Sequence, residues 1–514
     1  MQRDGARTSL WQMNMPAYPS PAVVPPTETM DVLIVGGGIT GVTTALLLQL
    51  AGKKCILAEA QTLCFGTTGG TTAHINTVLE HPYSEIESKF GENNAQLTAK
   101  ATKQAVALIR EHINKYKIDC GFSEQPGYLF AQNDKQEKQL EEILKATQKA
   151  GIDMQYTNDI PVPIPFTRAA IFQGQAKFHP ARYVYALAKA YEEAGGILMQ
   201  GCRVTKVEEG EEMEATTKYG LIKARDIIWA THIPPGVNLL HFRCAPYRSY
   251  AMALKLKGKN YPDGLVYDMF DPYHYYRTQE IDGENYLIAG GDDHKTAHQK
   301  DTNECFRNLE AHVRKYFDVE SIPFKWSSQY FENTDGLPYI GHLPGSPNNV
   351  YVATGFSGNG MTNGTISAFV LRDMLVHGKS EYQDLFDPNR LKPIAGFTTF
   401  VKESADVVGK MIGGWISTEK IEEVSELAKD EARVVKYEDH KLALYKDETG
   451  KLHAVNPVCP HAKCIVEWNT AEKSWDCPCH GSRFSADGIL LTGPSSLDLE
   501  EVELRELIKQ AEKK

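Results

Sequence analysis

Long apolar runs, basic clusters and a dispersed disulfide framework are all missing from this 514-residue sequence. No run of roughly 18 apolar residues occurs, so we expect no membrane-spanning helix. The formal net charge is −11 and no patch of Lys and Arg appears, which argues against a nucleic-acid partner. Residues 1–30 are rich in proline and lack the apolar core of a signal peptide. They predict an extended or disordered surface arm and a cytoplasmic protein.

The length exceeds what one compact core usually holds, so two or three domains are expected. Residues 381–425 begin with polar linker character and continue as an amphipathic helix that contains the apolar stretch VVGKMIGGWIS. We interpret this helix as buried; the alternative is peripheral contact with a membrane or a partner. A region of short strands and turns follows over residues 426–514, which predicts an all-β domain.

The ten cysteines fall into two groups. Six are scattered singly, as reduced buried thiols are: Cys55, Cys64, Cys120, Cys202, Cys244 and Cys305. The other four lie within 21 residues, between Cys459 and Cys479. Such clustering indicates one local metal or redox site rather than a secreted disulfide framework.

Residues 31–60, DVLIVGGGITGVTTALLLQLAGKKCILAEA, carry a complete βαβ dinucleotide fingerprint. A buried strand leads into three glycines at G-x-G-x-x-G spacing, then a helix, a second strand and an acid. The glycines allow a tight turn, close approach of a pyrophosphate and helix–strand packing, and the acid can accept ribose hydroxyls. The predicted contacts are Gly36, Gly38, Ile39, Thr40, Gly41 and Glu59.

The segments that follow favour FAD over NAD. QTLCFGTTGGTTAHIN, after Glu59, is rich in glycine and hydroxyl residues and suits a loop around a long cofactor. A second strand–turn–helix occurs in NNVYVATGFSGNGMTNGTISAFVLRDML, and its helix N-terminus can face a flavin carbonyl or a phosphate. No second complete fingerprint for NAD(P)H is present, which argues against a reductase driven by pyridine nucleotide.

Together these features resemble the amino-acid and amine oxidase family of FAD flavoproteins, which includes D-amino-acid oxidase, glycine oxidase and sarcosine oxidase. The resemblance covers residues 31–380 and implies an α/β FAD-binding Rossmann-like domain (about 31–79, 176–240 and 330–380) with an antiparallel-sheet substrate domain (about 80–175 and 241–329). It implies further cofactor contacts at Thr67, Thr68, Thr72, Val204, Gly355, Gly360 and Met361.

The same resemblance implies hydride transfer from a C–N bond of a small-molecule amine or amino acid to FAD. Glycine-oxidase-like members carry an Arg-Pro that clamps the substrate carboxylate, but the corresponding stretch here, WSSQYFENTDGLPYIG, has no arginine. An amine, an N-methylated compound or a differently clamped acid therefore remain open. Arg277 and Tyr275, on one face of a predicted strand, and His74 are the candidate substrate residues. The alternatives are that Arg277 and Tyr275 simply belong to a half-exposed strand and that His74 is an ordinary loop histidine.

The cysteine cluster lies in VCPHAKC and DCPCHGS. Zinc is the competing metal, but zinc ribbons use C-x₂₋₄-C pairs rather than C-x-H-x-x-C with C-x-C-H. The spacing resembles the Rieske iron–sulfur domain, which implies a [2Fe–2S] cluster bound by Cys459, His461, Cys477 and His480. The resemblance also implies a disulfide between Cys464 and Cys479. Ser482 matches a serine that donates to the cluster, whereas Phe484 replaces a tyrosine of respiratory members.

We therefore expect an FAD-dependent oxidoreductase that passes electrons from flavin to the Rieske cluster and on to an acceptor other than O₂. The expected acceptor is a quinone, a cytochrome or a small redox protein. One alternative is an electron-transfer component that feeds a separate oxygenase. Another is a redox sensor without enzymatic activity.

Overall fold

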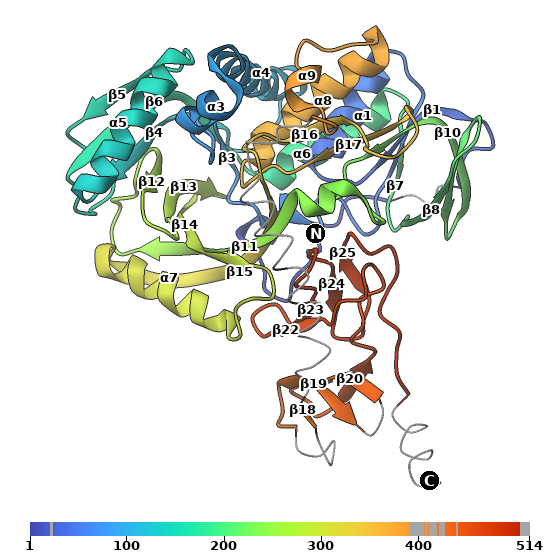
Figure 1. The fold of residues 1–514 in the computed structure, drawn as a ribbon. Coiled ribbons are helices and arrows are strands. Elements are labelled where there is room, and N and C mark those ends of the chain that lie inside the picture. The colour runs from blue at the N-terminus through green and yellow to red at the C-terminus, as the bar shows by residue number, and fades with distance from the viewer. Residues whose placement is uncertain are drawn as a thin grey trace.

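The computed structural model describes residues 1–20, 24–390, 406, 410, 419–420, 427–437 and 440–503. Its first sheet contains parallel strands in the order β17–β10–β1–β2–β7, with β16 antiparallel on β17 and the β8–β9 hairpin on β10 (Figure 1). Its strands are β1 (Met30–Val35), β2 (Cys55–Ala58), β7 (Ile197–Met199), β8 (Val204–Glu208), β9 (Met213–Thr217), β10 (Gly220–Trp229), β16 (Tyr339–His342) and β17 (Val350–Thr354).

Helix α1 (Ile39–Leu50) is buried along most of its length because other helices cover the side that faces away from the sheet. It packs against α6 (Pro180–Glu193) and α8 (Gly360–His377), and α4 (Glu92–Tyr116) covers α8. Strand β1 is buried on both faces, as parallel strands between helices are. The shorter helices of this unit are α2 (Thr67–Gly70), α3 (Tyr83–Phe90) and α9 (Gln383–Phe386).

A second sheet of nine strands has the order β15–β11–β14–β13–β12–β4–β6–β3, with β5 on β6. It is antiparallel apart from the β12–β4 pair, and a turn at Asp282-Gly283 joins β13 to β14. Helices α5 (Asp134–Lys149) and α7 (Thr302–Tyr316) pack on it. Its strands are β3 (His74–Ile75), β4 (Ser123–Ala131), β5 (Met154–Thr157), β6 (Arg168–Lys177), β11 (Cys244–Leu256), β12 (Leu265–Asp268), β13 (Tyr275–Ile281), β14 (Glu284–Lys295) and β15 (Val319–Asn333).

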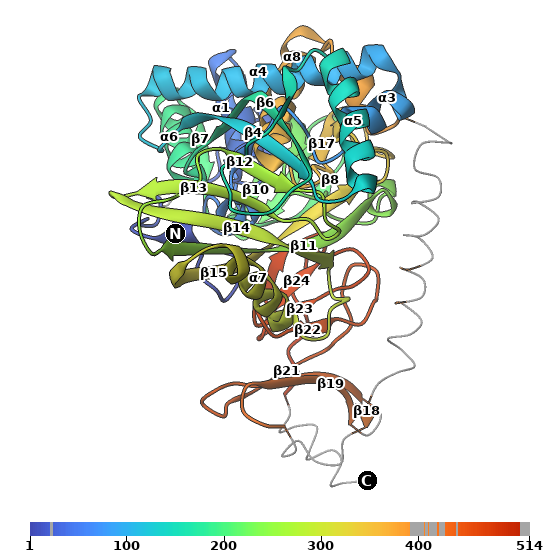
Figure 2. The same cartoon turned by 90° about the vertical axis from the view of Figure 1, so that its left-hand side faces the viewer.

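The C-terminal region consists of two four-stranded sheets, which confirms the all-β prediction (Figure 2). The outer sheet contains β18 (Glu419–Lys420), β19 (Glu431–Tyr437), β20 (His440–Lys446) and β21 (Leu452–Val455). The inner sheet contains β22 (Glu467–Asn469), β23 (Ser474–Asp476), β24 (Arg483–Ser485) and β25 (Leu490–Thr492). Most of the linker and amphipathic helix predicted for residues 381–425 lies outside the described residues. Within the described part of the chain, no helix is both long and apolar enough to cross a membrane.

The N-terminal residues differ from the expected surface arm. The chain start lies between the first two sheets and the C-terminal region (Figure 1). A 3₁₀ helix, η1 (Leu10–Gln12), holds the fully buried Trp11, whose indole N–H donates to the Thr71 carbonyl. Arg3 is also buried and forms an ion pair with Glu472 of the C-terminal region. The first part of the arm, residues 3–11, is therefore an interior strap because of its aromatic and charged anchors, whereas residues 12–20 and 24–29 are exposed or half-buried.

The contact between the C-terminal region and the rest of the chain is built around charged side chains. Six of them are no more than 7% exposed: Arg3, Asp4, Arg248, Glu472, Asp476 and Arg483. They pair across the contact, for example Arg483 with Asp4 at 2.9 Å. A buried charge is costly unless it is paired, so this interface holds its components in one arrangement.

Candidate cofactor and substrate sites

A cavity lies at the carboxyl ends of β1, β2 and β10, the edge at which open α/β sheets bind ligands. The glycine turn, the loop after β2, the segment after β10 and the start of α8 border it. Ten of the predicted cofactor residues line this cavity: Gly36, Gly38, Ile39, Thr40, Glu59, Thr67, Thr68, Val204, Gly360 and Met361.

The turn between β1 and α1 leaves no space for side chains. A Cβ added at Gly36 would lie 2.4 Å from the Ala230 carbonyl oxygen, and one at Gly41 would lie 1.9 Å from that of Gly36. Gly36 also has a φ of +116°, which favours glycine. Gly38 is the N-cap of α1, so the first amides of this helix border the cavity. This cradle fits the diphosphate of FAD.

Glu59 lies at the other end of the cradle. Its carboxylate accepts hydrogen bonds from the backbone N–H groups of Gly37 at 2.6 Å and Gln61 at 2.8 Å. Burial raises the pKa of this carboxyl, although the two N–H donors oppose the shift. Its place beside Val204 in the cavity lining fits the adenosine ribose.

Three predicted cofactor residues lie elsewhere. Gly41 serves the packing of α1 on the glycine turn, and Thr72 borders a second cavity next to the first. Gly355 lies outside the lining; its φ of +71° places it in the turn that leads from β17 toward α8.

The two cluster loops bring the predicted iron ligands together. The imidazole rings of His461 and His480 lie 5.0 Å apart, and the thiols of Cys459 and Cys477 are buried. His461 Nε2 donates to the Gly236 carbonyl at 3.1 Å, which leaves a buried Nδ1 without a partner. Neither ring nitrogen of His480 has a partner. Two thiols and two orphaned imidazole nitrogens fit a Rieske [2Fe–2S] cluster.

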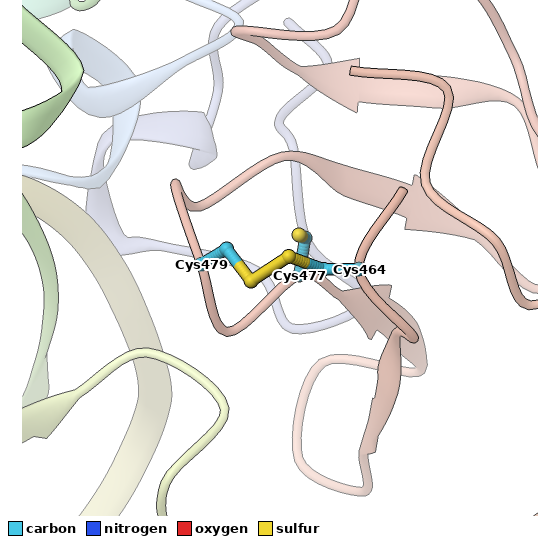
Figure 3. A group of neighbouring side chains, drawn as sticks. All are labelled: Cys464, Cys477 and Cys479. Carbon is cyan, nitrogen blue, oxygen red and sulfur yellow. A yellow bond between two sulfur atoms is a disulfide. The ribbon is translucent and has the colours of Figure 1, made fainter. Parts of the chain in front are cut away.

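The predicted disulfide between Cys464 and Cys479 is confirmed, with a Cα–Cα distance of 6.5 Å. Figure 3 shows the Cys477 thiol beside this bond, and the ligand atoms of the three cysteines lie within 4.8 Å of one another. Since Cys464 and Cys479 are bonded to each other, they tie the two cluster loops together and leave Cys477 for iron.

The surroundings of Cys459 stabilise a thiolate. Hydrogen bonds, led by one from the Cys477 thiol and including one from the Ser482 hydroxyl, lower the pKa of Cys459 to about 7. The Ser482 hydroxyl accepts the backbone N–H of Ser495 at 2.9 Å, so residues 493–496 are tied to the cluster loop. Phe484 is completely buried in the core of this region.

The cluster end of the Rieske-like region faces the cofactor cavity. Gly236, which binds His461, follows residues 231–235, several of which line that cavity. Residues 490–493, 495 and 496 form part of the cavity wall. His241 of the 3₁₀ helix η2 (Leu239–Phe242) packs its ring 4.7 Å from that of His461. The segment of residues 231–236 therefore borders the cofactor cavity and also contacts the loop that carries His461.

The second cavity lies beside the first and shares Thr67, Tyr330 and Gly358 with it. Two acids, Glu80 and Asp293, line it, and no Lys or Arg occurs among its described lining residues. Its aromatic lining consists of His74, Tyr267, Tyr273, Tyr275 and Tyr330. The Tyr330 hydroxyl donates to Asp293 at 3.0 Å.

The pKa values of Glu80 and Asp293 are both raised above their usual range. Burial raises the pKa of Glu80 to about 8 against the opposing hydrogen bond from Tyr273. Burial likewise raises the pKa of Asp293 to about 7, opposed by hydrogen bonds from Ser249 and Tyr330. A cation that enters this cavity would offset the desolvation and favour the ionised carboxylates.

Of the predicted substrate residues, Tyr275 and His74 line this cavity and Arg277 does not. The Arg277 guanidinium is completely buried and donates to the carbonyls of Ala73 and Phe178 at 3.2 Å each. It therefore supports the end of the loop from β2 to β3 and does not replace the missing carboxylate clamp. Burial, and next the charge of Arg277, lower the pKa of His74 well below its usual value, so this imidazole is neutral.

Sequence reasoning missed Glu80, Asp293 and Tyr330. Asp293 lies in GGDDH and Tyr273 in YHYY, two polar clusters beside predicted strands, which was the available signal. No feature of the sequence pointed to Glu80, because only the fold brings the end of the loop after β3 against β14. The wall supplied by residues 490–496 was likewise invisible, since it depends on docking between two units.

Comparison with known proteins supports both the FAD-binding part and the Rieske part of the chain. Residues 31–374 match the family described as FAD dependent oxidoreductase, and residues 417–503 match the Rieske [2Fe-2S] domain. A putative Rieske 2Fe-2S iron-sulfur protein, YhfW, from Bacillus subtilis is 33% identical over 97% of this chain and 98% of its own length. Gamma-glutamylputrescine oxidoreductase from Escherichia coli is 27% identical over 70% of this chain and 86% of its own length.

Among solved structures, glycine oxidase from Geobacillus kaustophilus superposes with a TM-score of 0.59 at 18% identity, over 71% of this chain and all of that one. At this level of sequence identity, the similarity is evidence for a shared fold only. The family match and the orphaned ligand atoms identify FAD and a [2Fe–2S] cluster as the cofactors. The chain thus belongs to the FAD-dependent oxidoreductase family and carries a C-terminal Rieske domain.

Proposed function

We propose that the chain dehydrogenates a cationic amine and passes the electrons through the Rieske cluster to an acceptor other than O₂. One observation carries the substrate class: the second cavity, which we call the substrate cavity, has two half-buried carboxyl groups, tyrosine walls and no cationic side chain among its described lining. An ammonium group would be attracted by both carboxylates and by the tyrosine ring faces. The α-carboxylate of an amino acid would find no cationic partner among these residues and would lie near two carboxyl groups.

When bound, FAD accepts two electrons from a C–N bond and the cluster accepts one electron at a time. Oxidation of R–CH₂–NH₃⁺ to R–CH=NH₂⁺ releases two electrons and two protons. Glu80 and Asp293, whose pKa values are raised to about 8 and about 7, are placed to take up a proton from the bound ammonium. The iminium then hydrolyses to a carbonyl compound, and two one-electron transfers reduce the outside acceptor.

The relative from Escherichia coli supports this choice, since its name gives gamma-glutamylputrescine, an amine, as its substrate. The docking of the Rieske domain supports the electron route, because His461 donates to the carbonyl of Gly236, which directly follows residues that line the cofactor cavity. A quinone, a cytochrome or a small redox protein would then serve as the acceptor.

Anaerobic mixing of the holoprotein with a panel of amines tests this proposal. Each primary or N-methyl amine is paired with the α-amino acid that has the same side chain. We expect amines to bleach the flavin and then reduce the cluster, while the paired amino acids react poorly. Bleaching by the amino acids alone would contradict the substrate class.

The same experiment separates the two rival functions. If the flavin is reduced only by an external reductase, the chain is an electron-transfer component for a separate oxygenase. If no compound in the panel changes the flavin spectrum, a redox sensor is favoured.

A further inference from the structure

One strand separates the substrate cavity from the Rieske domain. In β15, Ser328 and Tyr330, two residues apart, border the substrate cavity. Alternate side chains of a strand point to opposite faces, and on the other face Ser327 and Gln329 contact the Rieske domain. The wall between substrate and cluster loop is thus a single β-strand thick.

Among the β15 residues that contact the Rieske domain, Gln329 lies nearest to an iron ligand. Its side chain is completely buried, and its Nε2 donates to the Gly481 carbonyl at 2.8 Å. Gly481 follows the ligand His480 directly in the chain. The Gln329 backbone carbonyl accepts the hydroxyl of Thr67 at 2.9 Å, and Thr67 lines both cavities. Gln329 therefore joins the cofactor loop to the cluster loop.

The cluster loop packs directly against strands β11 and β15 of the second sheet. Gly481 has a φ of +78°, and a Cβ there would lie 2.6 Å from the Pro246 Cβ and 2.9 Å from the Gln329 Nε2. No side chain fits between the cluster loop and the second sheet. Thr296 fixes the orientation of the Gln329 amide, since its hydroxyl donates to Oε1 at 3.2 Å.

We infer that electrons pass from FAD to the cluster within one chain and that Gln329 is the positioning residue that holds the His480 loop against the cofactor cavity. This inference deepens the proposed function and rests on its electron route, not on the substrate. Reduced FAD would give up its two electrons one at a time, each electron would reduce the oxidised cluster, and the outside acceptor would reoxidise the cluster between the two transfers. Tunnelling falls steeply with distance, so a loop that recedes slows the transfer.

Flash photoreduction of FAD in the full holoprotein tests this inference without any amine substrate. Cluster reduction is then followed by its visible spectrum, and exchange of backbone hydrogens in residues 478–482 by mass spectrometry. In Gln329→Leu we expect cluster reduction to slow by roughly tenfold, a change of about 1.4 kcal/mol in activation free energy. Exchange in residues 478–482 should become faster. Gln329→Met, with similar length and no donor, should behave alike and provides a second variant.

Thr302→Val is the matched control, because the Thr302 hydroxyl donates to Asn469 at 2.9 Å in the same interface but away from the cluster loops. We expect it to keep the rate of cluster reduction of the parent protein. An unchanged rate in both Gln329 variants, or equal slowing in Thr302→Val, would overturn the inference. Failure of every amine in the substrate panel would leave this result intact, so the two proposals fail separately.

Discussion

Replacement of Arg483 by methionine should loosen the Rieske domain from the rest of the chain. The Arg483 guanidinium is completely buried and donates to the Asp4 carboxylate at 2.9 Å and to the Asp476 carboxylate at 3.1 Å. It also donates to the Asp4 carbonyl at 3.0 Å and the Ser474 hydroxyl at 3.1 Å. Methionine keeps the volume of the stem but removes the charge and all four hydrogen bonds.

The magnitude follows from the two carboxylates that remain. Loss of one partner of a buried ion pair costs about 3–5 kcal/mol, because the other charge is left without compensation. Arg3 lies 3.5 Å from Asp4, and Arg248 lies 3.9 Å from Asp476, so part of the charge stays neutralised. We therefore expect the lower limit, about 3 kcal/mol, which corresponds to a roughly 150-fold shift in the docking equilibrium.

Hydrogen–deuterium exchange of residues 1–12 and 474–485 in the holoprotein measures this shift. The control is Arg307→Met, since Arg307 is 63% exposed and pairs with Asp301 on the surface. Such a pair contributes at most about 1 kcal/mol. If Arg483→Met exchanged no faster than Arg307→Met at equal cluster content, the reasoning would be refuted.

The charged interface between the Rieske domain and the rest of the chain should lose stability at acidic pH. Burial raises the pKa of Glu472, but the charges of Arg3, Arg248 and Arg483 outweigh it and leave the pKa below its usual value. A lowered folded-state pKa gives stabilisation that is present above the unfolded value of about 4.3 and is lost as pH falls through the folded pKa. We expect constant protection near neutral pH and loss below about pH 4.

Three further predictions concern the cofactor and substrate sites. Gly41→Ala would place a Cβ 1.9 Å from the Gly36 carbonyl oxygen, so the purified protein should lose its flavin absorbance; full flavin content would contradict this. Glu80→Gln and Asp293→Asn should each weaken amine binding by roughly 10- to 150-fold, the equivalent of one charge-assisted hydrogen bond of about 1.5–3 kcal/mol. In the parent protein, amine affinity should rise with pH through the pKa values of about 7 and about 8, and in the variants the profile should flatten; a flat parent profile would argue against an ammonium site. Phe484→Tyr should add one hydrogen bond to the cluster surroundings and raise its midpoint potential by about 60–130 mV in a redox titration, whereas an unchanged potential would show that the hydroxyl does not reach the cluster.

The sequence alone was sufficient for features that depend on local spacing. The turn at Gly36, Gly38 and Gly41 is readable because its three glycines lie in one short segment between a strand and a helix, and the clash that a Cβ at Gly41 would meet, with the Gly36 carbonyl oxygen, is local. The same holds for the two cluster loops, where ligands and disulfide partners lie in two short segments. The Asp282-Gly283 pair is a local signal of the same kind, because an Asp-Gly turn favours a hairpin, and it joins β13 to β14.

Features that join distant segments were decided only by the tertiary structure. Arg277 matched the expected cation by type and strand position, yet burial directs it to the carbonyls of Ala73 and Phe178. The N-terminal residues read as a surface arm because proline content describes local stiffness and carries no information on distant anchors such as Glu472.

The substrate cavity and the contact between the Rieske domain and β15 also join segments that are distant in the sequence. Glu80 and Asp293 are 213 residues apart and meet only because β3 and β14 belong to one sheet. Gln329 reaches Gly481 only because the Rieske domain docks on β15. Local spacing therefore determined which cofactors this chain binds. Long-range packing, through burial, charge pairing and the fit of Gly481 against Pro246, decided how the Rieske domain docks and which side chains line the substrate cavity.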